Sequence, residues 1–221
     1  VAPGAYLVDI KVLTDAGGTN SANTARGLQW AISNVNTDWG NNDSSNGIDI
    51  LSMSYGSTSN PNSDDPGDNG TSAESQLVNQ ATNEGLICVI AMGNDGQRRV
   101  PSPASADTSI AIGASDDRDT DERDDDTIAS YSNWGPREDD GDNDDSDELK
   151  PDVVAPGSGI NAPMNAAGSL QLPGSPKPLA ENDYQEQSGT SNLVDALDTI
   201  TWWATYSFFH LDETPIRNAY L

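Results

Sequence analysis

The chain has 221 residues, with 36 acidic against 10 basic side chains and a formal net charge of −26. That length suits one domain large enough to bury a core. The charge excludes a nucleic-acid binder that neutralises phosphate and a protein that binds an anionic membrane surface. No apolar run approaches the roughly 20 residues of a membrane-spanning helix. The single cysteine excludes an internal disulfide framework and a cysteine-clustered metal site.

The acidic residues are placed unevenly. Apolar stretches such as 86–91 and 110–114 carry no charge, whereas the acids gather near 116–126 and 138–148. We expect a folded core under an acidic, lysine-poor surface, which a high-salt environment favours because screening removes self-repulsion. The alternatives are an acidic protein from ordinary salt, or two disordered acidic insertions.

The first half of the chain alternates between strand and helix patterns. Residues 6–12 are expected to form a strand, which two glycines at 17 and 18 end. Apolar residues at i, i+3, i+4 and i+7 predict an amphipathic helix over 21–35, followed by a strand over 48–54. A second helix is predicted from Ala73 to Ala81, and Gly85 ends it.

The second half begins with two uninterrupted apolar runs, 86–91 and 110–114, which are typical of strands covered on both faces. Shorter strands are predicted at 128–131 and 153–155. The order predicts an α/β fold, a mostly parallel sheet with helices on both faces. An aromatic helical stripe over 193–209 and a short final helix after Thr214-Pro215 complete the chain.

Two polar positions fall where an open parallel sheet places its ligands, outside the carboxyl ends of the strands. Asn94 follows the apolar strand 86–91, and its amide can donate to a developing oxyanion; alternatively it is a turn asparagine. Ser191 precedes a predicted helix, where the dipole favours a nucleophile; alternatively it is an N-cap. Each signal is weak alone.

Taken in order, these segments resemble the subtilisin-like serine proteases, or subtilases. The resemblance covers nearly the whole chain, and its ordered series is specific although each motif is short. It lies in residues 1–5, 11–13, 27–32, 50–56, 91–94, 102–104, 110–114, 131–136, 150–157 and 189–191.

The resemblance implies a role for each matching position. Ser191 would be the nucleophile, and Asn94 with the Ser191 N–H would form the oxyanion hole. Substrate, an extended peptide or protein, would add as a strand and fill a first specificity pocket; Met92 is bulkier than the residue usual in that pocket. The implied substrate-binding residues are Ser54, Tyr55, Gly56, Ala91, Met92 and Gly93.

The chain also departs from the family pattern. The family's catalytic Asp and His would precede its Ser, so both are expected before Val1, and this chain is predicted to be inactive alone. His210, the one histidine, would lie roughly 28 Å from Ser191 along a continuous helix and cannot be its base. Residues 192–198 differ from the usual post-serine helix, so a non-catalytic relative or remnant that at most binds extended peptides is the alternative.

We expect a single peptidase domain over 1–221, the C-terminal part of a secreted, salt-adapted enzyme, incomplete at its N-terminus. An incomplete sheet leaves an exposed edge, so the chain is expected to be poorly stable, oligomeric or aggregating. No cofactor is required for the implied chemistry. Calcium is possible but unassigned, since the acidic stretch 140–148 does not match an EF-hand loop.

Overall fold

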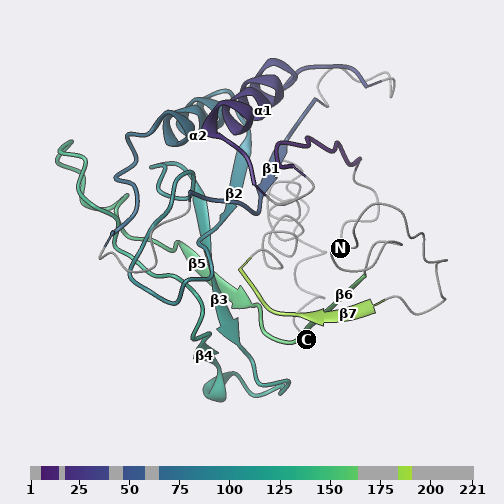
Figure 1. Ribbon diagram of the computed structural model, residues 1–221, viewed down its shortest axis with the longest axis vertical. Helices are drawn as coiled ribbons and strands as arrows, with labels where there is room; N and C mark the ends of the chain where they lie inside the picture. Colours follow the sequence, from purple (N-terminus) through teal and green to yellow (C-terminus); the bar gives the residue numbers. More distant parts are fainter. Residues whose placement is uncertain (1–5, 15–17, 40–46, 58–64, 164–183, 191–221) are drawn as a thin grey trace, which may run out of the picture.

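A computed structural model describes residues 6–14, 18–39, 47–57, 65–163 and 184–190 of the chain. Its centre is a sheet of parallel strands, β1 (Ile50–Met53), β2 (Ile87–Ala91), β3 (Ile110–Asp116) and β5 (Val153–Pro156). β1 pairs with β2, β2 with β3, and β3 with β5, all in parallel. This confirms the mostly parallel α/β sheet (Figure 1).

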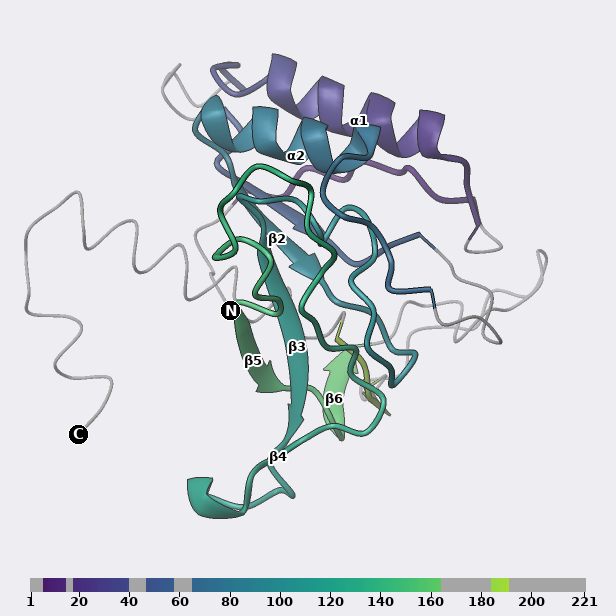
Figure 2. The ribbon, with the colours of Figure 1, turned by 90° about the vertical axis from the view of Figure 1, so that its left-hand side faces the viewer.

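Two helices lie side by side over one face of this sheet (Figures 1 and 2). Helix α1 (Ser21–Ser33) begins at Asn20, and helix α2 (Ala73–Asn83) begins at Ser72. In both, the capping side chain accepts a hydrogen bond from the backbone N–H three residues on, which satisfies one of the unpaired donors of the first turn. The helices therefore begin where polar caps precede the apolar stripes.

Alternation along the strands divides the core between the two faces of the sheet. One apolar cluster joins the helices to the sheet and contains Leu28, Val78, Leu51, Cys88 and Ile90. A second cluster on the opposite face contains Val89, Ala91, Ile112 and Ala114. β2 and β3 are thus buried on both faces, as their uninterrupted apolar sequences predict. Within the part of the chain that the structure describes, α1 and α2 both contact the first cluster. The helix predicted over 193–209 lies outside the described residues.

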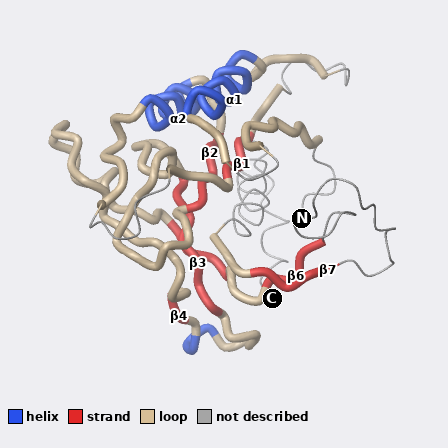
Figure 3. Tube along the Cα trace, viewed as in Figure 1, coloured by secondary structure: helices blue, strands red, loops and turns tan. Residues whose placement is uncertain are grey.

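Two strand predictions need correction, and one pair of strands was not predicted. Residues 6–12 form no strand, and Tyr6 and Leu7 are largely exposed, because no described strand forms a ladder with them. The strand expected at 128–131 is only the two-residue β4 (Thr127–Ile128), antiparallel to β3 after the short 3₁₀ helix Arg123–Asp125. An unpredicted antiparallel pair, β6 (Ile160–Pro163) and β7 (Tyr184–Gln187), follows β5 (Figure 3).

The acidic segment 116–126 is the connection between β3 and β4, and it extends away from the body of the sheet (Figure 2). Among the described residues, no helix is both long enough and apolar enough to cross a bilayer.

Candidate active site

The turn after β2 carries Asn94 at the carboxyl end of the sheet. The N–H of Met92 still donates to the Ile112 carbonyl at 3.0 Å, and Gly93 then adopts a φ of +96°. A Cβ on Gly93 would lie 2.8 Å from the Asn133 amide nitrogen, so glycine is required both for the backbone conformation and for space. The turn exposes the Asn94 side chain at the position where open α/β sheets bind ligands.

Thr190 orients the Asn94 amide. The N–H and the hydroxyl of Thr190 both donate to Asn94 Oδ1, at 2.9 and 3.0 Å. The Thr190 hydroxyl accepts in turn from the N–H of Gly93 at 3.2 Å, and Thr190 is fully buried. Because a backbone N–H can only donate, the atom facing it is the amide oxygen, and Asn94 Nδ2 is left as a donor. The structure thus brings the backbone just before Ser191 against Asn94; Ser191 itself lies outside the described residues.

The segment that follows β1 lies close to the same edge. Ser54 and Gly56 are exposed, so this segment lies at the surface, where an extended chain can approach it. Gly56 packs close to Pro101, and the N–H of Ser57 donates to the Ser102 carbonyl at 2.8 Å. This bond holds the segment against the chain that follows Asn94.

The side chains of Tyr55 and Met92 point into the core rather than toward this edge. Tyr55 packs against the helix-side cluster, and its hydroxyl contacts Met53 Sδ at 3.7 Å. Burial, with the nearby Glu74 charge, raises the pKa of the Tyr55 phenol. Met92 is wholly buried in the same cluster, and Ala91 is buried on the opposite face.

Asn133 is a residue of this region for which the sequence pattern predicts no role. It is 1% exposed, and its side chain bonds to both ends of the turn between Met92 and Asp95. The only signal in the sequence is its place in the motif 131–136, which by itself assigns nothing to a single residue.

The motif 150–157 is scaffolding for the sheet. Lys150 is buried, and its ammonium donates to the Ser109 carbonyl and the Asp152 carboxylate, each at 3.0 Å. Asp152 also accepts from the N–H of Ala111 at 2.7 Å. These bonds fix the start of β5 beside β3.

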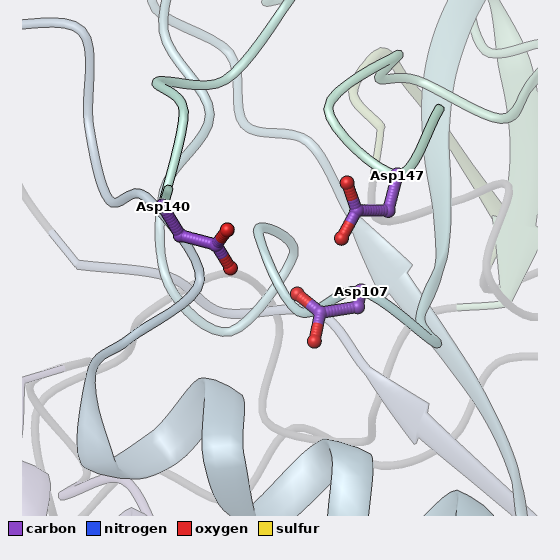
Figure 4. Close-up of side chains that lie close together, drawn as sticks. All are labelled: Asp107, Asp140 and Asp147. Carbon is purple, nitrogen blue, oxygen red and sulfur yellow. The ribbon is translucent and has the colours of Figure 1, made fainter. Parts of the chain in front are cut away.

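Away from the turn that carries Asn94, three carboxylates lie close together, those of Asp107, Asp140 and Asp147 (Figure 4). The fully buried guanidinium of Arg137 lies among them, with Nη2 at 3.0, 3.4 and 2.7 Å from their oxygens. Burial raises the pKa of Asp107, although the Arg137 charge opposes the shift. Calcium needs six to eight oxygen ligands that are free to face it. One oxygen of each carboxylate already pairs with a cation of the protein itself, so the cluster by itself assigns no calcium site.

Comparisons with known proteins identify the family of the chain. The model of the subtilase family (Peptidase_S8) matches residues 1–192. The chain is similar to the serine protease AprX of Bacillus subtilis (strain 168), with 32% identity over 198 residues, 86% of this chain and 40% of that protein. It is also similar to the alkaline elastase YaB of Bacillus sp. (strain YaB), with 30% identity over 79% of this chain and 35% of that protein. The chain therefore spans less than half the length of these two relatives.

Solved structures share the fold. Sphericase superposes with a TM-score of 0.56 at 23% identity, over 86% of this chain and 50% of that one. A cold-adapted subtilisin-like serine proteinase gives 0.50 at 21% identity, over 82% and 46%. With a family model that covers most of the chain and a relative above 30% identity, the chain belongs to the subtilase family of serine proteases.

Proposed function

We propose that this chain is the substrate-binding and nucleophile-bearing part of a serine endopeptidase. Ser191 attacks the scissile carbonyl, and Asn94 Nδ2 with the Ser191 N–H donates to the oxyanion that forms. The observation that carries the proposal is the pair of bonds from Thr190 to Asn94 Oδ1. They leave the other end of the amide as a donor beside the residue that precedes Ser191.

The substrate is an extended peptide or protein segment. The exposed segment that contains Ser54 and Gly56 binds substrate by strand addition, with Tyr55 between them packed against the core. The backbone of Ala91, Met92 and Gly93 forms one wall of the first specificity pocket. Since the Met92 side chain is buried elsewhere, its bulk does not shorten that pocket.

In the family order Asp, His, Ser, the general base and its orienting carboxylate precede the serine, and turnover by Ser191 needs both of them. No cofactor takes part in the chemistry, and no calcium ligands are assigned. The acidic surface suits a secreted enzyme that works in high salt, because salt screens the repulsion within a chain of net charge −26.

The test is hydrolysis of a fluorogenic peptide, in high salt, by the protein expressed with the coding sequence that precedes Val1. Ser191→Ala should abolish turnover. Asn94→Ala should lower kcat by about 10²–10³, the range that subtilisin shows for loss of the same donor, with little change in KM. Asn79→Ala is the matched control, since Asn79 bonds to Asp107 and Thr108 rather than to the site. Unchanged turnover in Ser191→Ala would refute the proposal.

The alternative is a subtilase relative that binds extended peptides without cleaving them. The altered segment 192–198 favours it. A fluorophosphonate probe separates the two candidates: it labels Ser191 of an activated protease, whereas a non-catalytic relative binds peptide and remains unlabelled.

A further inference from the structure

Asn133 bonds to the turn that carries Asn94 through every polar atom of its side chain. Its Nδ2 donates to the Met92 carbonyl and to the Asp95 carboxylate, each at 3.0 Å. Its Oδ1 accepts from the N–H of Asp95 at 2.9 Å. The Asn133 amide thereby joins the residue two positions before Asn94 to the residue just after it.

The chemistry of the partners fixes the orientation of this amide. The Asp95 N–H can only donate and the Met92 carbonyl can only accept, so a rotated Asn133 amide would lose both bonds. The backbone adds a further bond, from the N–H of Asn133 to the Gly93 carbonyl at 3.1 Å. Asn133 is 1% exposed, so bulk water does not compete for these bonds in the folded protein.

We propose that Asn133 is a positioning residue for the oxyanion hole, an inference that rests on the function proposed above. Thr190 fixes the side chain of Asn94, and Asn133 fixes the backbone turn from which that side chain projects. Both restraints are needed, because an oriented amide on a shifting turn would not point at the developing oxyanion. A misplacement of about 1 Å at a reacting centre can cost on the order of 10² in rate.

The positioning role predicts a specific pattern in a double-mutant cycle. The cycle uses the same protein as the hydrolysis test above. Asn133→Ala should lower kcat by about 10- to 100-fold and change KM by less than about threefold. On an Asn94→Ala background the same substitution should lower kcat by less than about twofold, because the donor that it positions is already gone. An equal loss of kcat on both backgrounds, or no loss on either, would overturn the inference.

A matched control separates positioning from general loss of stability. Asn79 also donates through Nδ2 to a carboxylate, Asp107 at 2.7 Å, and accepts a backbone N–H through Oδ1, from Thr108 at 3.2 Å. Asn79→Ala should lower the melting temperature without changing kcat. If Asn133→Ala does not fold, Asn133→Ser replaces it in the double-mutant cycle, because serine keeps a small polar group in the same space.

The cycle also distinguishes failure of the inference from failure of the proposed function. If Asn94→Ala itself leaves kcat unchanged, the oxyanion role is wrong and the inference falls with it. If Asn94→Ala lowers kcat while the Asn133 effect is the same on both backgrounds, only the positioning role is wrong.

Discussion

Cys88 lies within β2, 1% exposed, and burial raises the pKa of its thiol to about 11. Since the thiolate is the reactive form, and an ordinary thiol has a pKa about two units lower, folding should slow alkylation at pH 8 by at least about 100-fold. Mass spectrometry after a timed iodoacetamide pulse measures this, with urea-unfolded protein as the control. Equal labelling of the folded and unfolded protein would show that β2 is not packed as described.

Glu74, in the first turn of α2, gives a prediction for pH. Burial, with the nearby Asp68 charge, raises the pKa of Glu74 above 4.5. The folded state then holds this proton more tightly than the unfolded state, so ionisation of Glu74 lowers stability as pH rises from 4.5 through the raised pKa. Glu74→Gln, which keeps an oxygen for the Thr24 hydroxyl, should make the free energy of unfolding fall less steeply over that window.

Urea unfolding at a series of pH values tests the Glu74 prediction. Glu84→Gln, at the exposed far end of the same helix, is the control for removing one negative charge. If both variants give the same pH profile, burial of Glu74 is not the cause.

The site residues differ in how far sequence could identify them. Asn94 stands three residues after the end of an apolar strand, so its place at the sheet edge followed from local pattern. The bonds that Thr190 and Asn133 make to the turn join residues 96 and 38 positions apart, and no local pattern reports such contacts. Sequence therefore predicted where Asn94 lies, whereas the orientation of its amide required the structure.

At the scale of elements, the predictions succeeded where burial and capping decide the structure. Helices α1 and α2 and strands β1, β2, β3 and β5 all appear near their predicted positions, because their apolar spacing or runs have one favourable packing. Residues 6–12 have the same strand-like composition but no described ladder partner, and a strand needs one. β6 and β7 were missed because Pro163 and the polar run 184–187 give no strand signal.

Arg137 joins the acidic segment 138–148 to the body of the fold and gives a prediction at this scale. Its side chain is fully buried among three carboxylates and also bonds to the Asn69 carbonyl. Arg137→Met would leave these carboxylates facing one another without a cation, and should lower the free energy of unfolding by about 3–5 kcal/mol.

Chemical denaturation measures the Arg137 effect, and Arg123→Met is the matched control. Arg123 is exposed, so its loss should change stability by less than about 0.5 kcal/mol. Similar effects of the two substitutions would mean that the buried guanidinium is not a structural centre.

At the scale of the whole molecule, the net charge of −26 predicts that salt stabilises the fold. Raising NaCl from 0.1 to 1 M shortens the screening length from about 10 to about 3 Å. The melting temperature should rise by roughly 2–4 °C for each kcal/mol of repulsion that the salt relieves. Sucrose, which favours the compact state without screening charge, is the control; a melting temperature that is flat or falls with NaCl would contradict the prediction.

Both acidic segments begin and end on backbone that is already paired. The segment 116–126 is closed by pairing of Asp116 with Thr127, and 138–148 by the bond from the Arg137 N–H to the Glu148 carbonyl at 3.0 Å. Insertions or deletions between such fixed ends leave the register of the central strands unaltered. Mutation can therefore add or remove surface charge in single steps, so that adaptation to a new habitat need not disturb the residues that perform the chemistry.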